Sequence, residues 1–137
     1  MRALLLMLGM RAGLLACLLA AAPAWALAPR PVSADDLLPE RVLVGDASAR
    51  DRLIAVAYDP ISKAGGSLTE TVATYLDCGR SLELAARTMF VHANTVRYRL
   101  KKVAELTGWD VLSTRDAHVL ETAFALGRLR DSSRNVL

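Results

Sequence analysis

The sequence predicts an all-α protein built around a small helix-turn-helix bundle of about four helices. Apolar residues recur with helical spacing in four successive segments after residue 66. Residues that commonly begin or end helices separate these segments, and no alternating run bounded by turn residues indicates a strand. With 137 residues, the chain has room for one small domain with appendages. We divide it into an apolar leader, a proline-containing connector with one helix, a helix-turn-helix domain and a tail, at residues 1–26, 27–66, 67–130 and 131–137.

The leader is strongly apolar, since 23 of the first 28 residues are apolar. Pro23 and the following Ala24-Trp25-Ala26 are typical of the end of a secretory signal peptide. A membrane-spanning helix fits less well, because Arg11 would lie near its middle. A buried Leu/Ala helix that remains from an upstream domain is the other interpretation.

The connector combines an extended part with one helix. The prolines between residues 29 and 39 predict extended backbone. Asp46 is typical of an N-cap, and the apolar spacing after it predicts a helix to about Tyr58. Asp59-Pro60 is expected to end that helix, and residues 63–66 to form a flexible joint.

Two helices are expected at the start of the domain. Ser67 and Glu70 have the spacing of a capping box, which predicts a helix that Gly79 ends. Ser81 is placed to cap the second helix. Ala86 lies where that helix must approach the next one closely, so that a small side chain is required there.

The third helix is expected from near Asn94 to Thr107, with Gly108 after its last residue. Its core face carries Val96, Leu100, Val103 and Thr107. Ser113 and Asp116 form a second capping pattern, which begins the fourth helix. The apolar stripe of the fourth helix consists of Val119, Leu120, Ala123, Phe124 and Leu126.

The helices at 81–90 and 94–107 are only three or four residues apart, which is the spacing of a helix-turn-helix. Phe90 lies in the turn, where many such motifs have glycine. The face of the third helix opposite its core carries Asn94, Arg97, Tyr98, Lys101 and Lys102, while Thr95 and Arg99 flank the buried seam. From Asn94 to Lys102 there are four cations and no acid.

This one-signed face favours DNA binding over an ordinary solvated helix face, which normally mixes positive and negative charges. Arginine and lysine can neutralise phosphates or bind guanine, and asparagine can bind adenine. The net charge of the whole chain is only +3, which by itself does not indicate a nucleic-acid partner.

The segment LTETVATYLDCGRSLELAARTMFVHANTVRYRLKKVAELTGWDV, residues 68–111, resembles the C-terminal helix-turn-helix of PucR/CdaR-type bacterial transcriptional regulators. The most specific stretch is residues 90–100. In that family this stretch forms the turn and the start of the recognition helix, and Phe is normal at the turn. The family's upstream sensory domains have no counterpart here, so the resemblance implies DNA binding without naming an effector.

We therefore expect contacts with double-stranded DNA in two groups. Residues expected in the major groove are Asn94, Thr95, Arg97, Tyr98 and Lys101, near the start of the third helix. Residues expected at phosphates are Ser81, Arg99 and Lys102. His92, in the turn, is expected either to contact phosphate or to pack and hydrogen-bond locally.

The remaining expectations concern enzymatic activity, oligomeric state and cellular location. The chain has two cysteines, two histidines and no G-x-S-x-G, P-loop or G-x-G-x-x-G motif, so we expect no disulfide framework, metal, cofactor or enzymatic activity. We expect a cytoplasmic homodimer, in which the 46–58 helix either contributes to the dimer contact or packs on the helical domain. The alternative is a small exported or membrane-anchored helical protein that uses residues 1–26.

Overall fold

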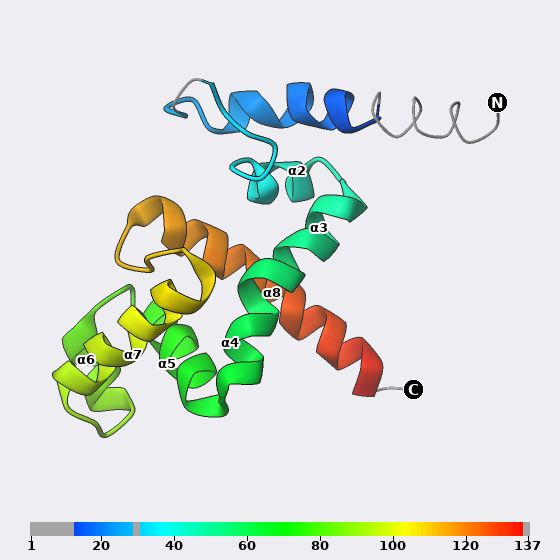
Figure 1. Cartoon of the computed structure of the whole chain (residues 1–137). Coiled ribbons are helices and arrows are strands. Elements are labelled where there is room, and N and C mark those ends of the chain that lie inside the picture. Colours follow the sequence, from blue (N-terminus) through cyan, green and yellow to red (C-terminus); the bar gives the residue numbers. More distant parts are fainter. Residues whose placement is uncertain (1–12, 29–30, 136–137) are drawn as a thin grey trace. The chain divides into compact units, whose positions relative to one another are not determined.

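The computed structural model describes residues 13–28 and 31–135 (Figure 1). Every regular element in these residues is helical, which confirms the predicted fold class. The chain divides into two compact units, unit 1 at residues 1–52 and unit 2 at residues 53–137. Residues 1–12 of the expected leader and the last two residues of the expected tail lie outside the described residues, and so does our interpretation of them.

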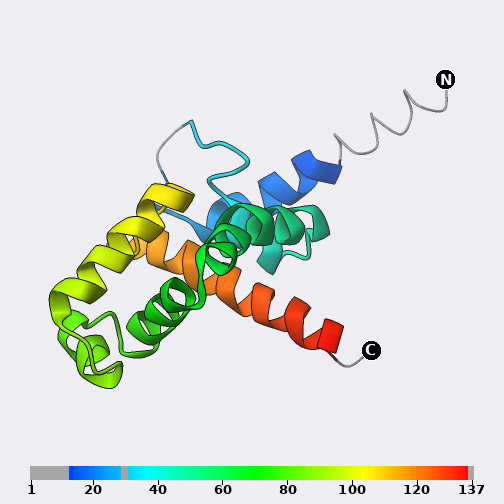
Figure 2. The ribbon, with the colours of Figure 1, turned by 60° about the horizontal axis from the view of Figure 1, so that its bottom comes forward.

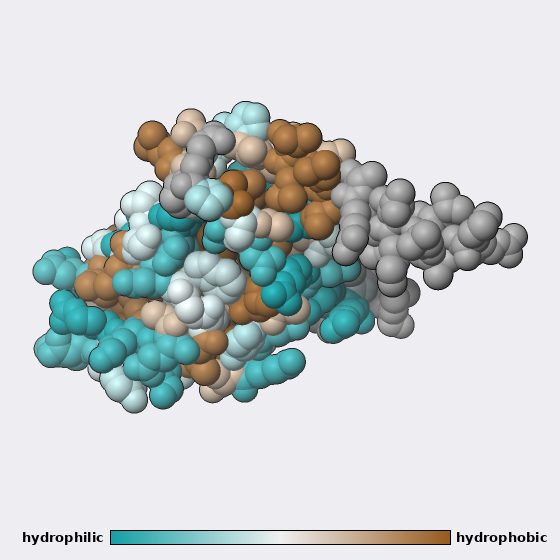
Figure 3. All heavy atoms as spheres, turned by 45° about the horizontal axis from the view of Figure 1, so that its top comes forward, coloured by the Kyte–Doolittle hydropathy of each residue, from teal (hydrophilic) through white to brown (hydrophobic). Residues whose placement is uncertain are grey.

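Unit 1 is more helical than the prolines suggest. Residues 13–21 are helical and are followed by η1 (Ala22–Ala24). The part expected to be extended contains α2 (Leu38–Leu43), because Pro39 lies in the first turn, where its missing N–H costs no hydrogen bond. In the described residues no helix is both long and apolar enough to cross a membrane. Several leucines are exposed, and Figure 3 shows the apolar patches of the surface.

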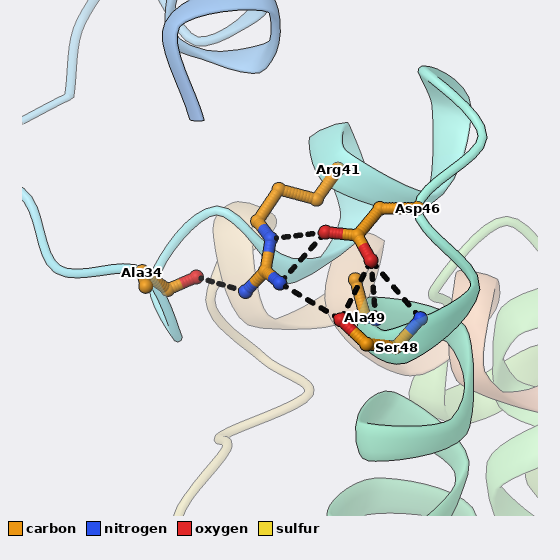
Figure 4. Close-up of polar contacts among 5 residues, drawn as sticks. All are labelled: Ala34, Arg41, Asp46, Ser48 and Ala49. Carbon is orange, nitrogen blue, oxygen red and sulfur yellow. Dashed lines mark hydrogen bonds and ion pairs between the residues drawn. The ribbon is translucent and has the colours of Figure 1, made fainter. Parts of the chain in front are cut away.

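An ion pair closes the turn between α2 and α3 (Ala47–Leu53), as Figure 4 shows. Arg41 donates to Asp46 Oδ2 at 2.9 and 2.7 Å and to the Ala34 carbonyl at 3.2 Å. Asp46 Oδ1 accepts from the N–H groups of Ser48 and Ala49, which confirms the predicted N-cap. Burial raises the pKa of Asp46, but the hydrogen bonds from Ser48 and Arg41 lower it by more, to about 2.

In unit 2 the chain does not leave the helical conformation at Asp59-Pro60, so the predicted helix end was wrong. A π-helical turn, η2 (Ile54–Tyr58), leads directly into α4 (Asp59–Ala64). The Asp59 N–H bonds to the Ile54 carbonyl, and this wider turn lets helical backbone continue into Pro60. Gly65, with φ of 129°, ends α4.

Helix α5 (Gly66–Asp77) begins one residue before the predicted cap. The expected capping box is wrong, since Gly65 is the N-cap and supplies no side chain. Ser67 instead lies in the first turn, where its carbonyl accepts a hydrogen bond from Thr71 Oγ1 at 2.6 Å. The end at Gly79 is confirmed, because Gly79 has φ of 63° and its N–H bonds to the Leu76 carbonyl.

The last three helices agree with the predicted order: α6 (Leu82–Thr88), α7 (Ala93–Thr107) and α8 (Thr114–Asn135). Gly108 ends α7 in the left-handed conformation, as expected. Helix α8 continues beyond residue 130 to Asn135, so that most of the expected tail is helical. Our domain boundary at residue 67 also differs from the start of unit 2 at Leu53.

The core of unit 2 joins η2 and α4 to the later helices α5, α6, α7 and α8. Helix η2 packs against α8, and α4 contacts α5 and α7, as Figures 1 and 2 show. Buried residues from every helix contribute, among them Ile54, Ile61, Val72, Ala86, Val96, Leu100, Val103, Leu120 and Phe124. Residues 54–58, the last part of the predicted 46–58 helix, therefore pack on the helical domain, which is the second of our two expectations for that helix.

Tyr58 and α8 approach each other closely. The Tyr58 ring meets the Phe124 ring edge to face, with centroids 5.3 Å apart. A Cβ added to Gly127 would overlap the Tyr58 ring. Glycine at position 127 therefore lets η2 and α8 come together at this point.

Polar groups at the rim of this contact also have partners. Tyr58 donates its hydroxyl to Asp131 Oδ2 at 2.9 Å, and Arg130 Nη2 lies 2.8 Å from Asp59 Oδ1. Burial, and the hydrogen bond to the Asp131 carboxylate, raise the pKa of Tyr58. The hydrogen bond to Asp59 raises the pKa of Arg130, so this guanidinium stays charged. We call these four residues, together with Phe124 and Gly127, the η2–α8 seam: Tyr58, Asp59, Phe124, Gly127, Arg130 and Asp131.

Candidate nucleic-acid interface

Helices α6 and α7 form the predicted helix-turn-helix. Ser81 caps α6 by accepting a hydrogen bond from the Leu84 N–H at 3.2 Å. After α6 the chain turns sharply at Phe90, whose φ is 55°. The Val91 N–H bonds back to the Ala86 carbonyl at 3.0 Å, which closes the turn before α7 begins.

Buried side chains hold α7 against the rest of unit 2. Val96, Leu100 and Val103 are no more than 1% exposed, as their helical spacing predicts. Ala86 is also buried, in agreement with the expected close approach of α6 to its neighbour. Because one side of α7 is fixed in this way, its opposite side is directed to solvent.

The first turn of α7 is organised by local hydrogen bonds. His92 is its N-cap, and His92 Nδ1 accepts from the Asn94 N–H at 3.2 Å. Asn94 Oδ1 in turn accepts from Arg97 Nη1 at 2.8 Å. Of our two expectations for His92, the structure shows the local hydrogen bond, and a phosphate contact stays a prediction. The pairing with Asn94 orients the Arg97 guanidinium at the start of the helix.

Four of the predicted groove residues share one exposed face of α7. They follow the spacing i, i+3, i+4 and i+7. We call them the α7 face, and they are Asn94, Arg97, Tyr98 and Lys101. Thr95, the fifth predicted residue, is only half-exposed. In the described part of the chain neither Arg97 nor Lys101 has an ion-pair partner.

One acid near this face was not anticipated from the sequence. Asp110 and Leu112, in the loop after α7, line a shallow hollow together with Arg97 and Lys101. The acid-free run therefore holds along α7 itself, while the following loop brings a carboxylate to its edge. Sequence spacing gave no signal for this approach, since it depends on the path of the loop.

The predicted phosphate residues have partners within the protein. Arg99 is half-buried and donates to Thr71 Oγ1 at 3.3 Å, which ties α7 to α5. Lys102 Nζ lies 3.5 Å from Glu105 Oε2, one turn further along α7, and both side chains are about half exposed. Arg99 is thus tied to another helix and Lys102 is paired with a carboxylate, whereas the hydrogen bond of Arg97 is to the neutral Asn94 on its own helix.

No group of three or more histidine, cysteine, aspartate or glutamate side chains that could hold a metal ion occurs among the described residues. The α7 face presents one amide, one phenol and two cations to solvent. This set can bind an anionic polymer and the edges of its bases.

Comparison with known proteins gives concordant similarities. Residues 68–126 match the family model described as the PucR C-terminal helix-turn-helix domain. Over 105 residues the chain is 52% identical to the uncharacterized protein Rv2242 of Mycobacterium tuberculosis and to the uncharacterized protein Mb2266 of Mycobacterium bovis. These matches cover 77% of the chain but 25% of each relative, so the chain spans about a quarter of the length of these curated relatives.

A solved structure is similar over a larger part of the chain. The crystal structure of a regulator of polyketide synthase expression from Bifidobacterium adolescentis matches with a TM-score of 0.80 and 50% sequence identity. The match covers 84% of this chain and 46% of that one. The helical arrangement described above is thus one that also occurs in a longer protein.

Proposed function

The chain carries a PucR C-terminal helix-turn-helix domain over residues 68–126, and from this premise we propose that it binds double-stranded DNA sequence-specifically as a transcriptional regulator. The observation that carries the proposal is the α7 face. Its two cations have no ion-pair partner within the described residues. Exposed charges of one sign contribute nothing to the free energy of unfolding, so the stability of the fold does not explain them. A face of this kind at the start of a recognition helix suits the major groove.

The α7 face offers distinct contacts with base edges. Arg97 can donate two parallel hydrogen bonds to guanine O6 and N7, and Asn94 can pair with adenine N6 and N7. The 2.8 Å bond between them fixes the guanidinium before DNA arrives, so less side-chain entropy is lost on binding. We assign Tyr98 and Lys101 to the same groove, with Thr95 at its margin.

Phosphate contacts position the domain without specifying sequence. We propose Lys102 for this role, because its pairing with Glu105 is half-exposed and readily exchanged for a phosphate. Ser81 and His92 are further candidates beside the N-termini of α6 and α7. Arg99 is the weakest candidate, since its guanidinium already bonds to Thr71.

We further propose that two copies bind together. A single helix-turn-helix module buries only about 600–1,000 Å² of protein surface on DNA. Dimers place two recognition helices about 34–36 Å apart, one DNA turn, which doubles the footprint. Sedimentation of the full chain with a palindromic duplex tests this, and one-to-one occupancy would contradict it. Residues 54–58 pack against α8, so this part of the predicted 46–58 helix is not proposed for the dimer contact.

The test of DNA binding is a titration at several salt concentrations. A duplex selected by the full chain from a random-sequence library serves as the probe. Arg97→Ala and Lys101→Ala should weaken binding, while Arg128→Ala, which removes an exposed cation on α8, should leave it unchanged. If Arg97→Ala and Lys101→Ala both preserve affinity and salt dependence, the α7 face is a solvated surface and the proposal fails.

DNA binding also implies a place of action. We propose that the protein acts in the cytoplasm and that Met1–Ala26 is not a working signal peptide. Fractionation of a bacterial host that expresses the full chain tests this. Recovery outside the cell of a mature form beginning at Leu27 would contradict it.

A further inference from the structure

Phe90 combines two unfavourable features in the turn of the helix-turn-helix. Its φ is 55°, in the left-handed region that glycine adopts far more easily than a bulky residue. Its side chain is 96% exposed, so the aromatic ring gains no burial in exchange. Strained residues of this kind are concentrated at functional positions such as active sites, ligand clamps and switch regions.

The turn on the other side of α6 shows that this geometry does not require phenylalanine. Gly79 and Phe90 occupy equivalent places, and each donates its N–H to the carbonyl three residues earlier. The next residue, Arg80 or Val91, donates to the carbonyl five residues earlier. The backbone would therefore accept glycine at position 90, so the geometry of the turn does not explain the phenylalanine.

Arg80 is the other non-glycine residue with positive φ among the described residues, and its side chain is accounted for internally. Arg80 Nη1 donates to Thr114 Oγ1 at 3.2 Å, which links the turn after α5 to the start of α8. Phe90 has no comparable use inside the chain, because its ring is almost wholly in solvent.

The location of Phe90 indicates what its partner is. It precedes His92, the N-cap of α7, by two residues, and Asn94 lies in the first turn of that helix. In helix-turn-helix complexes the first residues of the recognition helix reach base edges, so the turn comes close to the rim of the groove. A phenyl ring has no hydrogen-bond donor or acceptor for a phosphate or for a base edge.

Building on the proposed function, we propose that the Phe90 ring packs against the 5-methyl group of a thymine beside the bases contacted by α7. This methyl is the apolar group that DNA displays in the major groove. Apolar wedges between base steps are instead typical of minor-groove proteins. Phe90 is thus a specificity-determining residue that favours thymine at one position of the site.

The test removes the methyl group and the ring separately. Each thymine of the selected duplex is replaced in turn by deoxyuridine, which lacks only the 5-methyl. The full chain should lose about fourfold in affinity at one position, as expected for one buried methyl. Phe90→Gly and Phe90→Asn, which tolerate the left-handed conformation, should bind the thymine duplex roughly tenfold more weakly. Neither variant should distinguish deoxyuridine from thymine at that position.

Leu129→Ala is the matched control, since it removes a large side chain that is 66% exposed on α8. This variant should retain the full response to deoxyuridine. Thermal unfolding verifies folding, and the midpoint of Phe90→Gly should equal or exceed that of the parent chain.

The outcomes separate the two proposals. If the unaltered chain selects no sequence, the proposed function fails. If it selects a site but no thymine methyl matters, or if Phe90→Gly keeps the full response to deoxyuridine, the assignment of Phe90 is overturned while DNA binding stands. The assignment is also overturned if the substitution lowers affinity by the same factor, relative to the parent chain, on the thymine and the deoxyuridine duplex. That result would indicate a contact with the sugar-phosphate backbone or with a second protein copy.

Discussion

The η2–α8 seam and the α7 face belong to one compact unit, but they differ in whether their charged groups have partners of opposite charge inside the chain. In the seam, the Tyr58 hydroxyl and the Arg130 guanidinium both have carboxylate partners inside the chain. On the α7 face, Arg97 and Lys101 are exposed and have no ion-pair partner in the part of the chain that the structure describes. Partners inside the chain account for the charged groups of the seam but not for the two cations of the α7 face, and this difference supports our proposal that the α7 face binds DNA.

The largest effect is expected from a change on the buried side of α7 itself. Val96 is fully buried, so Val96→Asp places a carboxylate without a partner in the core. The expected cost is about 3–5 kcal/mol of the free energy of unfolding, enough to unfold a small domain. Urea titration followed by circular dichroism measures it, and a stable, folded Val96→Asp variant would contradict this account of the core.

Gly127→Ala tests the closest approach in the seam. The added Cβ would overlap the Tyr58 ring, and such overpacking costs about 1–3 kcal/mol, reduced by the roughly 1 kcal/mol that alanine gains over glycine in a helix. The control is the same change in a Tyr58→Leu background, where the cost should largely disappear. An equal cost in both backgrounds, measured by urea unfolding, would show that the ring is not the obstacle.

Arg97→Ala moves the test to the α7 face. The variant should lose roughly 1–3 kcal/mol of binding free energy and discriminate less well at one base pair. Its free energy of unfolding should stay unchanged, because the bond of Arg97 to Asn94 is exposed. A loss of stability that matches the loss of binding would remove the distinction between the two regions.

Tyr58→Phe removes one hydrogen bond from the rim of the seam and keeps the ring. The Tyr58–Asp131 bond should contribute about 1 kcal/mol to the free energy of unfolding. DNA affinity should not change, since the seam is expected to make no contact with DNA. Parallel unfolding and binding titrations measure both quantities, and weakened binding by a fully folded variant would show that the seam takes part in recognition.

Lys102→Ala should have the smallest effect. Loss of one phosphate contact should weaken binding to all sequences alike and lower the slope of log affinity against log salt by about one. Its stability should change by no more than about 0.5 kcal/mol, because the pair with Glu105 is half-exposed. An unchanged salt slope would mean that Lys102 keeps its partner Glu105 when DNA is bound.

The same comparison shows which features were accessible from sequence. Caps and helix ends at Asp46, Ser81, Gly79 and Gly108 were predicted, since each depends on neighbouring residues only. The α7 face was predicted as well, because helical periodicity fixes which side chains lie opposite the buried ones.

Errors arose where packing overrides a local rule. Pro60 usually ends a helix, yet η2 and α4 continue through it, and Ile54, Tyr58 and Ile61 are buried as a result. The partners of Arg99 and Lys102 were missed for different reasons. Thr71 is on another helix, beyond the reach of any local pattern, whereas Glu105 lies just past the run that we counted as free of acids.

The sequence by itself determined the helical class, the helix-turn-helix spacing and the charge of the α7 face, because each depends on residues within a few helical turns. Only the tertiary structure decided that the chain from Ile54 onward joins the bundle and that Arg99 is held by α5. It also decided that the Phe90 ring stays in solvent. These features depend on which surfaces of distant helices meet, and burial of apolar area across the whole unit outweighs the preferences of single residues.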